Sequence, residues 1–194
     1  MNYLYFVVLG CKPVGRVTEQ HDVFFGIGES IADLVPQIQA FWPDAGVGLH
    51  IDSFRRVRYI GDYSLAIVPR ENLLNNLLGK DDHSLHVYFI NLGGYRPQDM
   101  EEYHFKQLIV ADAMDTAIVE TQQTVFCTNL QDTHVDNKYA LDIDDCYQVE
   151  DLLTEELKNK FHIQVQVHDA SRKQEDTLHI GYLPIADALA YRDR

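Results

Sequence analysis

The feature that most constrains the fold of this chain is an internal similarity between its two halves. The segment LYFVVLG (residues 4–10) aligns with HVYFINLG (residues 86–93), so that Tyr5 meets Tyr88 and Gly10 meets Gly93. Further matches follow in the same order along the chain: Glu19 with Glu102, His21 with His104, His50 with His134, and Asp52 with Asp136. Ordered matches at a nearly constant separation predict a divergent tandem duplication.

Each predicted copy begins with a buried strand and continues through a loop and a helix to a second strand. In the first copy, residues 3–10 form the strand, and apolar residues at helical spacing follow. Pro43 ends this helix, a strand covers residues 49–60, and residues 63–68 return as a hairpin. The apolar positions of the helix are Ile31, Leu34, Ile38, Phe41 and Trp42.

The second copy is predicted to contain a strand over residues 85–93, a mostly helical segment over 101–121 and a strand over 133–143. A helix near residues 149–157 follows, then a hairpin of residues 161–168 with 177–183, and a short helix within 184–191. The expected fold class is α+β, with antiparallel or mixed sheets covered by helices on one face. The expected domains are residues 1–70 and 85–194, joined by a connection over residues 71–84.

The charge balance excludes several kinds of partner. The chain of 194 residues has 16 Lys and Arg against 30 Asp and Glu, a formal net charge of −14. Because nucleic acids and anionic lipids are bound mainly through Lys and Arg, neither partner is expected. The apolar run at residues 3–11 is far shorter than the roughly 20 residues that a membrane helix needs. We therefore expect a soluble, cytoplasmic protein.

The three cysteines predict neither disulfides nor a thiolate zinc site, because they are odd in number and widely spaced. They are Cys11, Cys127 and Cys146. Lys12 could lower the pKa of the neighbouring Cys11 thiol, but nucleophilic catalysis has little support in the sequence. The second copy has Gly94 at the corresponding position, so a catalytic thiol would belong to one copy only. No G-x-S-x-G motif occurs in the chain.

The repeated His-x-Asp pattern is the strongest candidate for a functional site. On a strand, His50 and Asp52 share one face, and the second copy repeats the pair as His134 and Asp136. If the two pairs meet, imidazole and carboxylate groups could bind a divalent metal ion, or an Asp could orient a His that acts as a general base. The alternative is a solvated sheet face with cross-strand ion pairs.

A second pattern, Glu-x-His, occurs as Glu19 with His21 and as Glu102 with His104. These pairs are expected in the loop before each helix, or in its first turn. There a carboxylate interacts favourably with the helix dipole, and loops at strand ends often bind ligands. Lys12 and Arg16, in the loop after the first strand, are candidates for binding an anionic small molecule.

The segments TEQHDVFFGIGESIADL, AFWPDAG and LHIDSFRRV resemble a bacterial family known as domain of unknown function 1543. The first copy resembles it from about Tyr3 to Pro69, whereas the second copy lacks the Gln-His-Asp and Phe-Trp-Pro runs. The resemblance implies a bacterial, cytoplasmic protein that carries one or two copies of the domain. It implies no activity, substrate or catalytic residue.

Three functional hypotheses follow from the sequence. The leading one is a non-enzymatic or ligand-binding duplicated module that forms a homodimer, with no cofactor required. The second is a metal-dependent hydrolase that uses His50, Asp52, His134 and Asp136. The third is a protein that binds an anionic small molecule at the strand-end loops.

Overall fold

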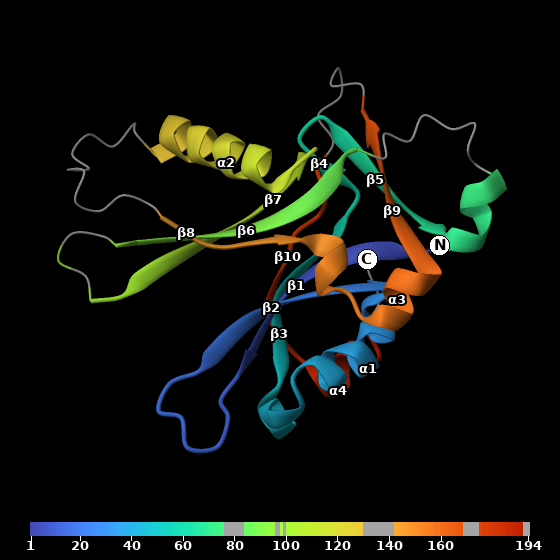
Figure 1. Ribbon diagram of the computed structural model, residues 1–194. Coiled ribbons are helices and arrows are strands. Elements are labelled where there is room, and N and C mark those ends of the chain that lie inside the picture. Colours follow the sequence, from blue (N-terminus) through green and yellow to red (C-terminus); the bar gives the residue numbers. More distant parts are fainter. Residues whose placement is uncertain (76–83, 96–97, 99, 130–141, 169–174, 192–194) are drawn as a thin grey trace. The chain divides into compact units, whose positions relative to one another are not determined.

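The computed structural model divides the chain into two compact units (Figure 1). Unit 1 contains residues 1–81 and 153–194, and unit 2 contains residues 82–152. The structure describes residues 1–75, 84–95, 98, 100–129, 142–168 and 175–191. Residues 153–194 therefore pack with the first unit, whereas the domain boundaries expected from the sequence placed them in the second.

The first sheet of unit 1 has four antiparallel strands in the order β10-β3-β1-β2. They are β1 (Tyr3–Cys11), β2 (Gln20–Gly28), β3 (His50–Val57) and β10 (His179–Pro184). Strand β1 is central, and its neighbours β2 and β3 both run antiparallel to it. The sequence prediction placed Glu19 and His21 in a loop or a first helical turn: Glu19 does lie in the loop, but His21 belongs to strand β2.

A second sheet of unit 1 has the order β4-β5-β9 and contains β4 (Tyr59–Ile60), β5 (Tyr63–Pro69) and β9 (Phe161–Val167). The hairpin expected between residues 161–168 and 177–183 does not form. Strand β9 pairs with β5, and β10 pairs with β3. These partners are distant in sequence, so local turn signals could not reveal the pairing.

Helix α1 (Ile31–Phe41) covers one face of the first sheet, as the apolar spacing predicted. Its buried side chains pack against Tyr5, Val7 and Leu9 of β1. The helix begins after Ser30, and Asp33 accepts hydrogen bonds from the backbone N–H and hydroxyl of Ser30 at 2.9 and 3.1 Å. This reciprocal cap fixes the helix start. The apolar residues of α1 that are buried are Ile31, Leu34, Val35 and Ile38.

The C-terminal part of unit 1 also contains α3 (Glu155–Lys160) and α4 (Ile185–Ala188). The segment before β10 is held by the Asp176 side chain, which is 1% exposed. Its carboxylate accepts hydrogen bonds from the backbone N–H groups of Arg58 and Tyr59, at 2.8 and 3.1 Å, and from Arg58 Nε at 3.0 Å. These bonds anchor the C-terminal segment to the start of the β4-β5 hairpin.

Unit 2 has a three-stranded antiparallel sheet in the order β7-β6-β8. The strands are β6 (His86–Tyr95), β7 (Glu102–Ala111) and β8 (Asp142–Gln148), followed by a 3₁₀ helix at Val149–Leu152. Helix α2 (Met114–Asn129) lies against the sheet, where Ala117 packs with Tyr88, Ile90 and Leu92 (Figure 1). The first part of the predicted helix over 101–121 is therefore strand β7, and only the remainder is helical.

The two units place corresponding residues in the same strand registers. Gly10 of β1 pairs with His21 of β2 and His50 of β3. In unit 2, Gly93 pairs with His104 of β7 and Asp142 of β8. Both third strands bulge, at Asp52 in β3 and at Asp144 in β8. By register, the residue of unit 2 that corresponds to Asp52 is therefore Asp144, and the residue that corresponds to His50 is Asp142.

The mixture of antiparallel sheets and few helices confirms the α+β class. Among the described residues, no helix is long and apolar enough to cross a membrane. In unit 1 a helix covers one face of the sheet around β1, and in unit 2 a helix covers one face of the sheet around β6. In both sheets, the glycine at the end of the central strand points to the opposite face. That face carries the candidate site.

Candidate functional site

A glycine at the end of β1 creates the space for a polar cluster in unit 1. Leu9 packs on the face covered by α1, so Gly10 points to the opposite face because side chains alternate along a strand. A side chain at Gly10 would collide with the cluster, since its Cβ atom would lie 2.5 Å from His50 Nε2 and 3.0 Å from Asp52 Oδ2. The imidazoles that flank this glycine, from His21 and His50, can therefore lean toward each other above it.

Four side chains meet above Gly10, and we call them cluster 1: Glu19, His21, His50 and Asp52. The Nε2 atom of His50 lies 3.2 Å from Glu19 Oε1 and 3.2 Å from Asp52 Oδ1. The Nε2 atom of His21 lies 3.6 Å from Glu19 Oε2 and 3.3 Å from Asp52 Oδ2. Each carboxylate thus faces both imidazoles, and both imidazoles present the same nitrogen.

The orientation of His50 is fixed by its other ring nitrogen. Nδ1 lies 2.9 Å from the carbonyl oxygen of Gly48, which can only accept, so Nδ1 carries the hydrogen and donates it. In the neutral ring, Nε2 is then a lone pair that points at two carboxylates. A hydrogen bond from the second nitrogen to a backbone carbonyl is the arrangement that commonly orients a histidine bound to a metal ion.

The burial of His50 distinguishes it from the rest of cluster 1. Its side chain is 3% exposed, whereas those of His21, Glu19 and Asp52 are 49%, 45% and 31% exposed. Strand β10 covers it, because Pro184 pairs with His50 and the Tyr182 ring lies 4.2 Å from the imidazole centroid. The cluster is therefore closed on the β10 side and open to solvent on the side of His21 and Glu19.

Cluster 1 has the composition of a transition-metal site. With both imidazoles in the neutral form that binds metal ions, the two carboxylates give the cluster a charge of −2, which a divalent cation balances. Ligand atoms about 2.0–2.2 Å from a tetrahedral zinc ion lie about 3.3–3.6 Å from each other. The four N···O distances of 3.2, 3.2, 3.3 and 3.6 Å fall close to this range. These distances involve both oxygens of each carboxylate, and no three donor atoms of cluster 1, one from each residue, lie within 4.8 Å of one another. The four side chains would therefore have to move closer together to surround one ion.

A similar cluster occupies the corresponding position in unit 2, and we call it cluster 2: Glu102, His104 and Asp144. His104 Nε2 lies 3.3 Å from Asp144 Oδ2 and 4.0 Å from Glu102 Oε2. One ligand atom from each residue can be chosen so that all three lie within 4.8 Å of one another. Gly93 lies beneath, where an added Cβ atom would meet Asp144 Oδ1 and Glu102 Oε1, each at 2.8 Å.

The structure brings together some of the residues predicted from sequence and adds one that was missed. Glu19, His21, His50 and Asp52 form a single cluster, although in the sequence they belong to two separate patterns. His134 and Asp136 lie outside the described residues. Asp144 was missed, although its position one residue after the apolar Ile143 repeats the Ile51-Asp52 pair.

The anion-binding candidates Lys12 and Arg16 lie in the exposed loop between β1 and β2. The backbone N–H of Arg16 donates to the carbonyl of Pro13 at 3.2 Å, which closes a turn in this loop. No helix begins directly after the second glycine of the loop, Gly15, because the chain enters β2 instead. The loop therefore lacks the helix N-terminus that a phosphate-binding loop uses.

The structure also argues against Cys11 as a nucleophile activated by Lys12. Cys11 is fully buried in the core beneath α1. Burial raises the pKa of its thiol, and the negative charge of Glu19 raises it further. The thiol is therefore kept protonated and away from solvent, which is the opposite of a reactive nucleophile.

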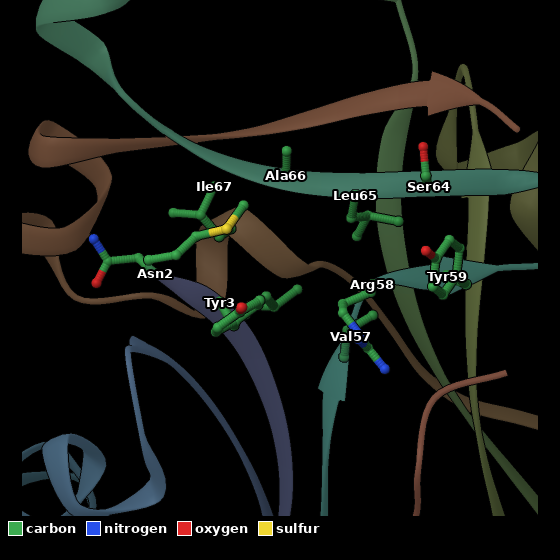
Figure 2. A pocket seen from close by; sticks show the side chains of 11 residues that line it. Asn2, Tyr3, Val57, Arg58, Tyr59, Ser64, Leu65, Ala66 and Ile67 are labelled. Carbon is green, nitrogen blue, oxygen red and sulfur yellow. The ribbon is translucent and has the colours of Figure 1, made fainter. Parts of the chain in front are cut away.

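A small cavity of about 180 Å³ lies in unit 1 between the ends of β1 and β3 and strand β5 (Figure 2). Figure 2 shows Tyr3, Val57 and Leu65 directed into the same space. None of the predicted site residues lines this cavity. The cavity therefore offers no chemistry comparable to that of cluster 1.

Comparison with known proteins supports the fold and the family resemblance but names no activity. The family described as Domain of Unknown Function (DUF1543) matches residues 16–67, which confirms the resemblance over that segment. This segment contains all four residues of cluster 1. No curated protein matches the chain.

A solved structure, described as the crystal structure of a protein Il1583 from Idiomarina loihiensis, is similar to the chain in fold. The similarity covers 95% of this chain and 98% of that one, with a TM-score of 0.63 and 22% sequence identity. At this identity the likeness concerns the fold alone.

Proposed function

We propose that this protein is a divalent-metal-binding module and that cluster 1 is its principal site, with a preference for ions such as Zn²⁺, Co²⁺ and Ni²⁺. This specifies the ligand of the non-enzymatic, ligand-binding module expected from the sequence. Imidazole suits these ions, and the two carboxylates supply the compensating charge. His50, His21, Asp52 and Glu19 are the proposed ligands.

The observation that carries this proposal is the orientation of His50. Its Nδ1–H is used by the Gly48 carbonyl, and its Nε2 is 3.2 Å from one oxygen of Glu19 and from one oxygen of Asp52. A lone pair directed at two carboxylates is repulsive unless a cation lies between them. Within a 3%-exposed side chain, that repulsion is poorly screened by water.

A protonated His50 bridging the two carboxylates is the competing explanation for the cluster. Charge-assisted N–H···O bonds have typical lengths of about 2.7–2.9 Å. The N···O distances of cluster 1 are all longer, at 3.2–3.6 Å. The imidazoles and carboxylates are therefore further apart than in direct charge-assisted hydrogen bonds.

Isothermal titration of untagged protein with Zn²⁺ and Co²⁺ tests the proposal. His50→Ala and His21→Ala should each weaken binding by at least about tenfold, the lower end of the range known for changes in metal-site shells. His162→Ala, on β9 and outside both clusters, is the matched control. Because His21 is half exposed, its variant tests binding even if the His50 variant folds poorly. Unchanged affinity in both variants, or no binding by the wild type, would overturn the proposal.

A metal-dependent hydrolase remains the second candidate, supported by the solvent access of cluster 1 on the side of His21 and Glu19. A metal ion held by fewer than its full number of protein ligands can bind and activate water. Screening Zn²⁺- and Co²⁺-loaded protein against ester, phosphoester and amide substrates tests this candidate. Activity that is lost in His21→Ala would support it, and absence of turnover in a loaded protein would favour the binding module.

We also propose that the two units arose by duplication and that the protein forms a homodimer. Strand β10 is an edge of the first sheet, and it presents Ile180 and Tyr182 with exposures of 80% and 68%, next to Leu178 just before the strand, which is 55% exposed. Exposed apolar edge strands readily pair with another chain. Sedimentation equilibrium tests the dimer, and Ile180→Lys should shift it toward monomer. A wild-type monomer at high micromolar concentration would contradict it.

A further inference from the structure

We infer that cluster 2 is a second divalent-cation site, one that favours harder ions such as Mn²⁺ more than cluster 1 does. This inference extends the proposed function, but it rests on residues of unit 2 alone. The proposed ligands are Glu102, His104 and Asp144.

The strand geometry of unit 2 reproduces the features that gather cluster 1. A Glu-x-His pair lies at the start of a flanking strand, and its His pairs with a glycine of the central strand. In unit 2, His104 pairs with Gly93. A bulge on the other flanking strand turns an Asp toward the same glycine, as Asp144 turns toward Gly93. Two different segments of sequence thus build a similar arrangement of a Glu, a His and an Asp, and cluster 2 lacks a counterpart of the His50 imidazole.

The two carboxylates of cluster 2 lie close together, and the cluster contains no Lys or Arg that would balance their charge. Glu102 Oε1 and Asp144 Oδ1 each lie 2.8 Å from the position that a Cβ atom on Gly93 would occupy. His104 contributes the only described nitrogen ligand, 3.3 Å from Asp144. Two carboxylates in such proximity repel each other, and a divalent cation relieves the repulsion.

The difference in donors between the two clusters predicts a difference in selectivity. Cluster 1 offers two imidazoles, whereas cluster 2 offers one imidazole and two carboxylates. Imidazole favours Zn²⁺, Ni²⁺ and Cu²⁺, and carboxylate suits Mg²⁺, Ca²⁺ and Mn²⁺. The ratio of Zn²⁺ affinity to Mn²⁺ affinity should therefore be smaller at cluster 2 than at cluster 1.

Mn²⁺ binding followed by electron paramagnetic resonance, with three variants of untagged protein, tests the inference. The double variant His21→Ala/His50→Ala removes cluster 1 and should retain one Mn²⁺ ion, with wild-type affinity at cluster 2. The double variant Glu102→Gln/Asp144→Asn should lose that ion, with affinity reduced by at least about tenfold. A third variant, Glu101→Gln, removes a carboxylate next to cluster 2 and should behave as the wild type.

The outcomes separate this inference from the proposed function. If the cluster 1 variant binds no Mn²⁺ up to millimolar concentration, cluster 2 is not a cation site. If Mn²⁺ binds but the Glu102→Gln/Asp144→Asn variant binds it equally well, the assignment of ligands is wrong. Competition with Zn²⁺ gives the affinity ratio at each cluster, and an equal ratio would overturn the difference in selectivity. Loss of Zn²⁺ binding from the cluster 2 variant would instead contradict the role of cluster 1.

Discussion

The Nε2 atom of His50 lies 3.2 Å from Oδ1 of Asp52, although these residues are separated by one residue on β3. Side chains two positions apart on a regular strand leave the backbone about 7 Å apart. The bulge at Asp52 changes the direction of its side chain, and Gly10 on the neighbouring strand leaves the space above it empty. Bulges are common beside functional sites for this reason.

The role of Gly10 gives a direct prediction. Gly10→Ala would place a methyl group 2.5 Å from His50 Nε2 and displace the imidazole. We expect the affinity for Zn²⁺ to fall about 10- to 100-fold, as for other changes that misplace a metal ligand. Gly48→Ala is the matched control, because its added Cβ atom would have no neighbour closer than 4.0 Å and the carbonyl that binds His50 is retained.

Titration calorimetry measures this effect, and thermal unfolding confirms that the Gly10→Ala variant is folded. An affinity equal to that of the wild type would show that the space above Gly10 is not needed for binding.

The sequence predicted the parts of the fold that depend on local patterns. The apolar spacing of Ile31, Leu34 and Ile38 correctly identified α1, and the run LYFVVLG correctly identified β1. It did not reveal β2, because the polar Gln20, His21 and Asp22 conceal the start of a strand whose later residues are buried. The same error assigned the first part of β7 to a helix.

The candidate site was only half predictable, because it depends on strand pairing rather than on sequence distance. His50 and Asp52 were identified as a pair, but their approach to Glu19 and His21 requires the registers of β1 with both β2 and β3. In the second half, the alignment matched His50 with His134, whereas the register of β8 places Asp142 there. The second half has extra residues before β8 compared with the first half before β3, and an alignment based on a few scattered identities does not detect them.

Asp176 should contribute to the stability of unit 1 without affecting metal binding. Its nearly buried carboxylate accepts three hydrogen bonds from Arg58 and Tyr59. Asp176→Asn should lower the free energy of unfolding by about 1–3 kcal/mol, the cost of leaving buried donors poorly satisfied. Urea unfolding measures this loss, with the exposed neighbour Glu175→Gln as the control. Equal stability of the two variants would show that the anchor is dispensable.

Cys11 should be unreactive in the folded protein. Its pKa is raised by burial and by Glu19, so the thiolate fraction near neutral pH is below that of an ordinary cysteine. We expect iodoacetamide at pH 8 to leave Cys11 unmodified under native conditions and to modify it after unfolding in urea. Peptide mass spectrometry distinguishes it from Cys127 and Cys146 in the same sample. Rapid native modification of Cys11 would contradict its position in the core.

The central claim is that His21 and His50 bind one metal ion through their Nε2 atoms. The most direct measurement is a Zn²⁺ titration of protein with ¹⁵N-labelled histidines, followed by the chemical shifts of the ring nitrogens. We predict that the Nε2 resonances of both residues change together and stop changing at one equivalent bound to cluster 1, while Nδ1 of His50 keeps its hydrogen. Unchanged Nε2 resonances of His21 and His50 at millimolar Zn²⁺ would contradict the account.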